Sequence, residues 1–257
     1  MFVDAALARR LERAEGLVGS SFVEARRSPS SEWRELGGAI ANCDGADSPM
    51  TQTFALGLCD PIDLAAIEDF FTARGTDTMH EVSPFAGVET TAALVERGYR
   101  PIEMSNVLVQ QIDDPRPSPA VRVIDPGEAA TWIETSVAGW SSDPEAVAFL
   151  RGFAELSLNN RRMTQYLGTV DGAPAATGVL AIEDGIAVLA GASTVPSARG
   201  RGAQAALLAT RLADAKHRGC AIAMMVAAVG STSQRNAERN GFRVAYTRTK
   251  WRRARSL

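Results

Sequence analysis

Histidine and cysteine are scarce in this sequence, and both shortages limit the chemistry that it can support. The 257 residues include two histidines and three cysteines, Cys43, Cys59 and Cys220. The cysteines are far apart and lack the spacing of a zinc site. An odd number of widely separated cysteines does not suit a disulfide framework and fits reduced thiols in a cytoplasm. We therefore expect no bound metal, no disulfides and a cytoplasmic location.

A long apolar run and an excess of positive charge are also missing. The longest nearly apolar run, Cys220 to Val229, is too short to cross a bilayer and favours a buried strand. Residues 1–16 mix Arg with Asp and Glu, unlike a secretory signal. The 27 basic and 30 acidic residues give a formal charge of −3. No general basic field would draw the chain to nucleic acid or to a membrane, so a phosphate-bearing ligand would need a local site.

The composition is otherwise that of a globular protein with a sizeable core. Hydrophobic residues make up 46% of the chain and charged residues 22%. Three prolines fall within residues 115–119, where they remove backbone donors and favour extended conformations. We take this segment as a linker between two domains, residues 1–114 and 120–257.

Residues 1–114 are predicted to contain helices and strands in alternation. Apolar residues recur at helical spacing behind Asp4, and this helix is expected to end near Gly16. Extended segments flank the turn-rich residues 44–49 and suggest an antiparallel pair. The predicted strands are 35–43, 53–58, 78–82 and 99–111, and the later helices are 63–73 and 87–97.

Residues 120–257 are predicted to form a strand and two helices, then three antiparallel strands, and then a helix–strand–helix–strand pattern. The dipeptides Asp171-Gly172 and Asp184-Gly185 favour tight hairpins between the three strands. The predicted strands are 121–124, 164–170, 175–183, 186–194, 221–229 and 242–250, and the helices are 128–139, one behind Asp143, 202–218 and 232–240. Gly98-Tyr99-Arg100 and Gly241-Phe242-Arg243 follow similar helices, which suggests a weak internal duplication.

The turn between the strand 186–194 and the helix 202–218 is the best candidate for a binding site. Gly200 and Gly202 permit a tight turn whose N–H groups converge, and the helix start adds partial positive charge. Arg199 and Arg201 supply forked donors that match phosphate oxygens. The tetrapeptide Arg-Gly-Arg-Gly alone is more simply a solvated turn. Its position between a strand and a strong helix favours a diphosphate site.

Two other phosphate-binding motifs do not match this turn. A nucleotide-hydrolase loop needs a lysine and then Ser or Thr after its last glycine, where Ala203 and Gln204 stand here. A dinucleotide-binding fingerprint needs a third glycine and a downstream acidic residue, and neither is present.

The same residues resemble the cofactor motif of the GNAT superfamily of acyl-CoA-dependent N-acetyltransferases. In that motif a strand is followed by Gln or Arg, any two residues, Gly, any residue, and Gly or Ala before a long helix. Residues 199–204 match it, except that Gln204 replaces the final small residue. The resemblance runs from about Val121 to Trp251. Residues 1–114 look like a degenerate copy, because residues 59–62 have no glycine cradle, and should not bind CoA.

The resemblance implies an α+β fold with two GNAT-like domains, each a mixed, mostly antiparallel sheet flanked by helices. It also implies acetyl-CoA as the acyl donor. The pantetheine arm would pair with residues 192–194, and main-chain N–H groups of residues 201–205 would hold the diphosphate. The expected cofactor-binding residues are Ser193, Thr194, Val195, Arg199, Gly200, Arg201, Gly202, Ala203, Gln204, Ala205 and Asn236.

The acid and the base of the reaction are not identified by the sequence. Family members often carry a tyrosine where this chain has Ala237 and an asparagine where it has Gly230. Ser233, Tyr246 and Glu183 remain as catalytic candidates. Residues 231–234 also fit a capping box in which Ser231 caps the helix and Gln234 reaches back. Tyrosines on strands are more often packed than catalytic, and Glu183 can serve in hairpin formation. A route through ordered water would need none of them.

These features predict an enzyme that transfers acetyl from acetyl-CoA to a primary amine by direct attack. The alternative is a non-catalytic acyl-CoA-binding sensor or regulatory protein, because the usual tyrosine is missing and residues 186–194 contain no carboxylate. We expect a small-molecule or peptide amine as substrate, no nucleic-acid or membrane partner, and a homodimer as one arrangement that the sequence allows. The basic end, Lys250 to Arg255, is expected to be solvated or to contact the 3′-phosphate of CoA.

Overall fold

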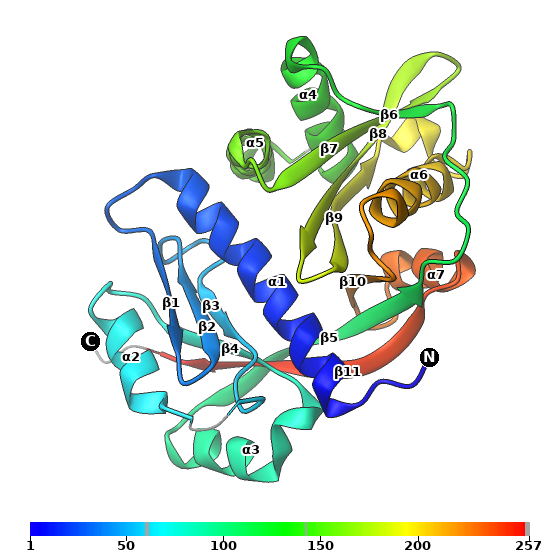
Figure 1. Ribbon diagram of the computed structural model, residues 1–257. Helices are drawn as coiled ribbons and strands as arrows, with labels where there is room; N and C mark the ends of the chain where they lie inside the picture. The colour runs from blue at the N-terminus through cyan, green and yellow to red at the C-terminus, as the bar shows by residue number, and fades with distance from the viewer. Residues whose placement is uncertain (60–61, 142, 255–257) are drawn as a thin grey trace. The chain divides into compact units, whose positions relative to one another are not determined.

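A computed structural model describes residues 1–59, 62–141 and 143–254, which form an α+β fold of two compact units (Figure 1). Unit 1 comprises residues 1–108 and 226–234 and the C-terminal segment from Val244. Unit 2 comprises residues 109–225 and 235–243. The predicted linker at 115–119 would divide the chain at a single point. The compact units instead group the C-terminal segment with the N-terminal residues.

Unit 1 has the strand order β1-β2-β3-β4-β11-β5. The pairs β1–β2, β2–β3 and β4–β11 are antiparallel, and β3–β4 is parallel. Helices α2 and α3 share a buried core with β4 that includes Ile67, Phe71, Val82 and Leu94. The elements are α1 (Ala5–Arg26), β1 (Glu32–Leu36), β2 (Ala39–Cys43), β3 (Gln52–Phe54), α2 (Leu64–Thr72), β4 (Thr78–Val82), α3 (Gly87–Glu96), β5 (Arg100–Gln111), which ends in unit 2, and β11 (Arg243–Arg253).

Helix α1 begins as predicted, with the Asp4 carboxylate accepting from the Leu7 N–H, but it does not end near Gly16. It continues to Arg26 because Gly16 and Gly19 bring the helix close to β2 and β3. A Cβ added at Gly19 would lie 2.6 Å from the Asn42 side-chain nitrogen. These glycines serve close packing, so the helix does not stop at them.

The predicted strand 35–43 is a hairpin. Gly37 and Gly38 both have positive φ, 55° and 75°, and form the turn between β1 and β2. Two successive residues with positive φ match the tight turn that the twist of a hairpin favours.

The C-terminal strand corrects the expectation for the basic end of the chain. Residues 250–253 belong to β11 and pair with β4. Their ion pairs join Lys250 to Glu81, Arg252 to Asp77 and Arg253 to Glu68. The basic end is therefore paired with acidic residues of unit 1, and Arg255 lies outside the described residues.

Arg248 anchors β11 in the core of unit 1. Its side chain is 2% exposed and lies within 3.2 Å of carboxylate oxygens of Glu12, Glu15 and Glu81. Burial raises the pKa of Glu12 to about 7. Glu12 and Glu15 come from α1, so this cluster joins the two ends of the chain within one unit.

Unit 2 has the strand order β10-β9-β8-β7-β6, with β9–β10 parallel and the other pairs antiparallel. The turns at Asp171-Gly172 and Asp184-Gly185 have positive φ at both residues, as predicted. The elements are β6 (Val121–Val123), α4 (Ala129–Trp140), α5 (Pro144–Asn159), β7 (Met163–Val170), β8 (Ala173–Glu183), β9 (Ile186–Thr194), α6 (Ala203–His217), β10 (Ile222–Ala228), which ends in unit 1, and α7 (Thr232–Arg239), which begins in unit 1.

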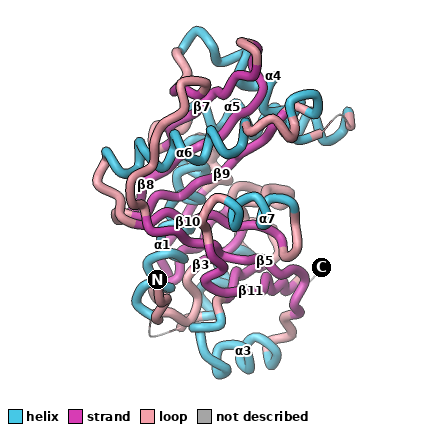
Figure 2. The backbone as a smooth tube through the Cα atoms, turned by 90° about the vertical axis from the view of Figure 1, so that its right-hand side faces the viewer, coloured by secondary structure: helices cyan, strands magenta, loops and turns pink. Residues whose placement is uncertain are grey.

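Helices α4 and α6 cover opposite faces of β8. The Thr177 side chain meets Ser193, whose hydroxyl donates to the α4 carbonyl of Ser136, whereas Gly178 faces Arg211 of α6. Successive strand residues point to opposite faces of a sheet. Figure 2 shows α6 running beside β8 and β9.

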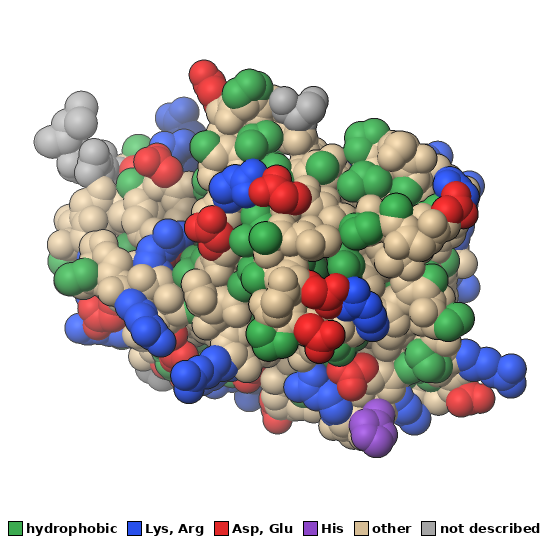
Figure 3. Space-filling view, turned by 90° about the horizontal axis from the view of Figure 1, so that it is seen from above, with side chains coloured by type: hydrophobic (Ala, Val, Ile, Leu, Met, Phe, Trp, Pro, Cys, Tyr) green, Lys and Arg blue, Asp and Glu red, His purple; other side chains and the backbone are tan. Residues whose placement is uncertain are grey.

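Among the described residues, no helix is long and apolar enough to span a bilayer. Acidic and basic side chains are interspersed over the face shown in Figure 3.

Candidate functional site

The predicted turn links the end of β9 to the start of α6 in unit 2. Residues 196–198 form one turn of 3₁₀ helix, and Gly202 is the N-terminal cap of α6 with φ of 82°. Gly200 also has a positive φ of 75°. This backbone conformation disfavours residues with a side chain, so the two glycines are needed for the geometry of the turn.

The main-chain N–H groups of residues 201–205 are available to a ligand. The cap residue Gly202 has no side chain to accept from the first turn of α6. The first helix amide with a backbone acceptor is that of Ala206, which donates to the Gly202 carbonyl at 3.0 Å. No described residue accepts from the five preceding amides. They form a donor cluster at the positive end of a helix dipole.

The space in front of this donor cluster is open. A Cβ added at Gly200 or at Gly202 would have no other heavy atom within 4 Å. Gly202 is exposed, and Ala203 is buried beneath the turn. The turn therefore fits the diphosphate of an acyl-CoA in both donor set and space.

The two arginines of the turn have protein partners. The Arg199 guanidinium donates to the carbonyl of Thr194 at 3.3 Å and to that of Gly139 at 3.1 Å. Arg201 forms an exposed ion pair with Asp171 at 2.7 Å. Their predicted role as phosphate ligands stays a prediction, and in this conformation Arg199 ties the turn to the end of α4.

Gln204 turns away from the amide cluster and toward the end of β9. Its side-chain nitrogen donates to the Ser193 carbonyl at 3.0 Å and to the Thr194 hydroxyl at 2.7 Å. The Val195 N–H donates to the Ala175 carbonyl. Gln204, which departs from the family motif, thus leaves the diphosphate position open. Its side chain instead binds the Ser193 carbonyl, which belongs to the strand end predicted to pair with pantetheine.

Gly139, which sequence analysis missed, fixes the end of β9 from the other side. A Cβ added there would lie 2.5 Å from the Ser193 hydroxyl oxygen and 2.8 Å from the Thr194 amide nitrogen. Only glycine allows α4 to approach β9 this closely. The contact joins residues more than fifty positions apart, so no local pattern in the sequence reveals it.

The candidates on α7 have helix-terminal surroundings. The Ser231 hydroxyl accepts from the Gln234 N–H, as predicted for a cap, while the Gln234 side chain accepts from the Gly230 N–H. Ser233 is exposed. Asn236 is half-buried, and its carbonyl accepts from the Asn240 side chain.

The other catalytic candidates are placed in ways that their alternatives explain. The Tyr246 hydroxyl, in unit 1, donates to Glu12 at 2.8 Å, and burial raises the pKa of this phenol. Glu183 forms an ion pair with Arg162 at the hairpin that begins β9. Glu183 lies opposite Ile186, the first residue of β9. Thr194 is eight residues beyond Ile186 along β9, which is about 26 Å at the usual rise per residue. Glu183 therefore does not lie at the turn.

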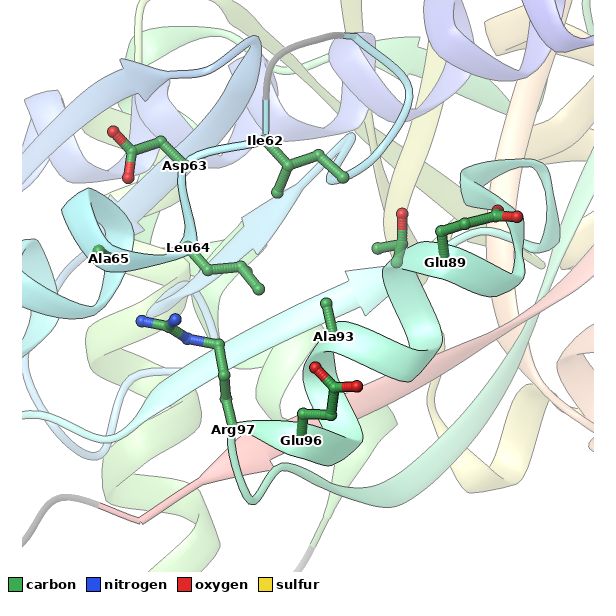
Figure 4. A pocket seen from close by; sticks show the side chains of 9 residues that line it. Ile62, Asp63, Leu64, Ala65, Glu89, Ala93, Glu96 and Arg97 are labelled. Carbon is green, nitrogen blue, oxygen red and sulfur yellow. The ribbon is translucent and has the colours of Figure 1, made fainter.

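The corresponding strand-to-helix connection of unit 1 differs from the turn in unit 2. The Asp63 carboxylate caps α2 by accepting from the Ala66 N–H at 2.9 Å. Beside it, a cavity of about 410 Å³ lies between the start of α2 and α3 (Figure 4). Its lining includes three carboxylates, Asp63, Glu89 and Glu96, and one cation, Arg97, which is already paired with Glu68. The net negative charge of this lining disfavours a diphosphate. Asp60 and Pro61 of the predicted degenerate cradle lie outside the described residues.

Solved structures with similar folds include GNAT acetyltransferases. A GCN5-related N-acetyltransferase from Kribbella flavida aligns over 94% of this chain and 96% of its own, with a TM-score of 0.62 and 20% identity. A tandem GNAT protein from the clavulanic acid biosynthesis pathway covers 94% and 88%, with a TM-score of 0.60 and 14% identity. A GCN5-related N-acetyltransferase from Sphaerobacter thermophilus covers 87% and 76%, with a TM-score of 0.57 and 15% identity.

The sequence itself gives no closer assignment, because it matches no family model and no curated protein. The structural likeness extends over both units, as the tandem GNAT protein shows. The chain therefore has the tandem α+β fold of GNAT acetyltransferases, as the sequence motif predicted.

Proposed function

We propose that this chain is an acetyl-CoA-dependent N-acetyltransferase that acetylates a primary amine, with the acyl donor bound at the turn of unit 2. The observation that carries the proposal is the set of five consecutive main-chain N–H groups, residues 201–205, that no described residue accepts from. A charge-assisted hydrogen bond contributes about 1.5–3 kcal/mol, so three such bonds together contribute about 4.5–9 kcal/mol, which spans dissociation constants from about millimolar to about micromolar.

The residues of the turn would bind and orient the donor. Amides 201–205 would hold the diphosphate, and the end of β9, residues 192–194, would align the pantetheine arm. Gly139 and Arg199 fix this strand end from the α4 side. Bound acetyl-CoA supplies an activated thioester, and the protein contributes the position of its carbonyl group relative to the amine.

The proposed reaction needs no covalent enzyme intermediate. The neutral amine nitrogen attacks the acetyl carbonyl carbon, a C–N bond forms and the C–S bond breaks. The amine loses a proton to a base or to water, and the departing thiolate gains one. Main-chain N–H groups stabilise the negative charge that develops on the carbonyl oxygen.

A sensor function is the second candidate, and one observation favours it. Ala237 occupies the position at which the family often has its acidic tyrosine, and it is fully buried. No proton donor can therefore act from that position. A chain that binds acyl-CoA without turnover would fit this feature.

The test measures binding and turnover in the same preparation. Purified protein is titrated with CoA by calorimetry and then incubated with acetyl-CoA and a panel of amines, with thiol release followed by a chromogenic disulfide. We expect CoA binding and amine-dependent thiol release. Binding without release from any amine would favour the sensor, and the absence of both would refute the proposal.

A further inference from the structure

The strand β9 contains a bulge at its exposed middle. Thr177 of β8 lies opposite Ser193, but Val179 lies opposite Ala190, so β9 has one more residue than β8 across this interval. Gly191 takes the extra position with φ of 59°. Ala190 and Gly191 are exposed, although the residues before and after them in β9 are mostly buried. A bulge of this kind re-aims the main chain at a defined point.

The neighbouring strand leaves this part of β9 open. The parallel pairing of β9 with β10 runs from Ile186 opposite Ile222 to Val188 opposite Met224. Strand β9 continues to Thr194 beyond that last pair. The bulge therefore lies past the end of the ladder, where main-chain groups of β9 can meet a ligand.

A buried arginine supports the bulge from α6. Arg211 is 1% exposed, and its Nη1 donates to the carbonyls of Val179 at 3.1 Å and Ala190 at 3.3 Å. Its Nε donates to the carbonyl of Leu207 at 3.2 Å. Within the described chain no carboxylate forms an ion pair with it. Burial lowers the pKa of Arg211 to about 10, so the guanidinium keeps its proton at neutral pH.

Stability alone does not account for this arrangement. Burying a cation without a counter-ion is costly, and an apolar side chain would fill the same position of α6 at lower cost. Gly178 on β8 makes room for the guanidinium, since a Cβ there would lie 3.0 Å from Arg211 Cζ. The backbone of Gly178 does not have positive φ. Glycine at position 178 therefore provides space for the arginine side chain.

The direction of the Ala190–Gly191 peptide follows from its contact with Arg211. The C=O and N–H of a trans peptide point in opposite directions. Because the Ala190 carbonyl points to the guanidinium, the Gly191 N–H points away from it. The positive charge also polarises this peptide and strengthens its N–H as a donor.

We propose that Arg211 is a positioning residue for acyl transfer: it fixes the Ala190–Gly191 peptide so that the Gly191 N–H donates to the acyl carbonyl oxygen as negative charge develops there. This inference rests on the proposed function for its kinetic effect. Its structural part, the fixing of the bulge, is independent of turnover.

The experiment compares Arg211→Met with Arg211→Lys, Gly178→Ala and the control Arg218→Met, which removes the arginine at the C-terminal cap of α6. The loss of one oriented donor should lower kcat about 100-fold in Arg211→Met. The dissociation constant of CoA and the KM for the amine should stay within about threefold, because amides 201–205 are unchanged. Arg211→Lys should recover about tenfold of the lost kcat. A kcat of Arg211→Met within threefold of wild type would overturn the proposal.

Gly178→Ala keeps the charge and shifts the guanidinium by a few tenths of an ångström, so it carries the test if Arg211→Met does not fold. Its kcat should fall about tenfold at unchanged CoA affinity, and an unchanged kcat would contradict the proposal. If wild type releases no thiol, the proposed function fails by itself. Amide hydrogen exchange at residues 190–192 then decides the structural part: Arg211→Met should accelerate it relative to Arg218→Met, and equal exchange would refute the role of Arg211.

Discussion

Two helices of this chain follow a strand of the sheet in similar ways but begin with opposite chemistry. Helix α6 of unit 2 has Gly202 as its N-terminal cap, and the amides of its first turn have no acceptor among the described residues. Helix α2 of unit 1 has Asp63, whose carboxylate accepts from the Ala66 N–H. The first helix presents free donors to a ligand, and the second has an internal anion in the same position.

The difference shows how one residue changes the use of a helix start. A capping carboxylate satisfies a main-chain donor and places negative charge where an external phosphate would bind. A capping glycine leaves both the donors and the space available. The comparison predicts that exchanging the cap residues makes each helix start partly resemble the other. It also predicts that a cap substitution changes CoA affinity much more at α6 than at α2.

The largest effect is expected from Gly202→Asp, which gives α6 the cap that α2 has. The new carboxylate would accept from the first-turn amides and repel the diphosphate, and the φ of 82° adds strain. CoA affinity should fall at least about 100-fold, since charged hydrogen bonds contribute about 1.5–3 kcal/mol each. Calorimetric titration with CoA measures the change.

Two matched variants separate charge from strain in this prediction. Gly202→Asn adds a similar side chain without charge, and it should retain more affinity than Gly202→Asp. Gly219→Asp introduces a carboxylate at another open glycine with positive φ, at the far end of α6. It should leave CoA affinity unchanged. Equal affinity of Gly202→Asp and wild type would exclude this turn as the diphosphate site.

The second effect concerns a buried, uncharged imidazole in unit 1. His80 is fully buried, and neither ring nitrogen has a hydrogen-bond partner among the described residues. Burial lowers the pKa of His80 to about 3 from its ordinary value of 6.5. The folded state therefore binds fewer protons than the unfolded state, so stability is full above pH 6.5 and falls as pH decreases toward 3.

This loss should reach about 1.6 kcal/mol between pH 6.5 and pH 5, because the slope rises toward about 1.4 kcal/mol per pH unit only below pH 6.5. Denaturant unfolding of wild type and His80→Leu at both pH values provides the measurement. The leucine variant should lose correspondingly less stability on acidification. Parallel pH dependence of the two proteins would contradict the assignment to His80.

Local patterns in the sequence were sufficient for most elements and for the turn. The helix starts at Asp4, near Asp63 and at Asp143 and the strand at 78–82 lie where they were predicted, because their signals fall within a few residues. Gly200 and Gly202 were identified for the same reason. Gly16 was misinterpreted as a helix end, since its packing partners in β2 and β3 are more than twenty residues away.

The features that position the candidate site were not predictable in this way. Gly139, Gly191 and Arg211 act through contacts with other elements, and no motif marks them. The ion pairs of Lys250, Arg252 and Arg253 likewise join residues more than 160 positions apart, so the basic end was expected to be solvated or to contact CoA. Tertiary packing decides such cases, whereas the sequence shows only the residue types.

The variant Gly139→Ala tests how far the packing of α4 on the end of β9 supports the turn of unit 2. The added methyl group would lie 2.5 Å from the Ser193 oxygen and would displace the end of β9. CoA affinity should fall about tenfold, as expected when small shifts misplace binding groups. Gly152→Ala, in α5 with nothing within 4 Å, is the matched control and should leave CoA binding unchanged.

A smaller change in the opposite direction is expected from Gln204→Ala. This variant frees the Ser193 carbonyl for the pantetheine arm and restores the small residue of the motif. Affinity for CoA should rise about fivefold, the equivalent of about one neutral hydrogen bond. Gln204→Glu keeps the size but adds negative charge near the turn, and its affinity should fall. A decrease with alanine as well would show that Gln204 itself contacts the ligand.

The smallest effect tests the other side of the comparison, at α2. Asp63→Ala removes the cap of this helix and should lower the free energy of unfolding by about 1 kcal/mol, since the Ala66 N–H loses its acceptor. It should not change CoA affinity, because the cavity beside α2 keeps Glu89 and Glu96. Denaturant unfolding and calorimetry measure the two quantities. If a second equivalent of CoA bound to Asp63→Ala, the start of α2 would have kept the ability to bind a diphosphate, and the capping carboxylate alone would be what blocks it.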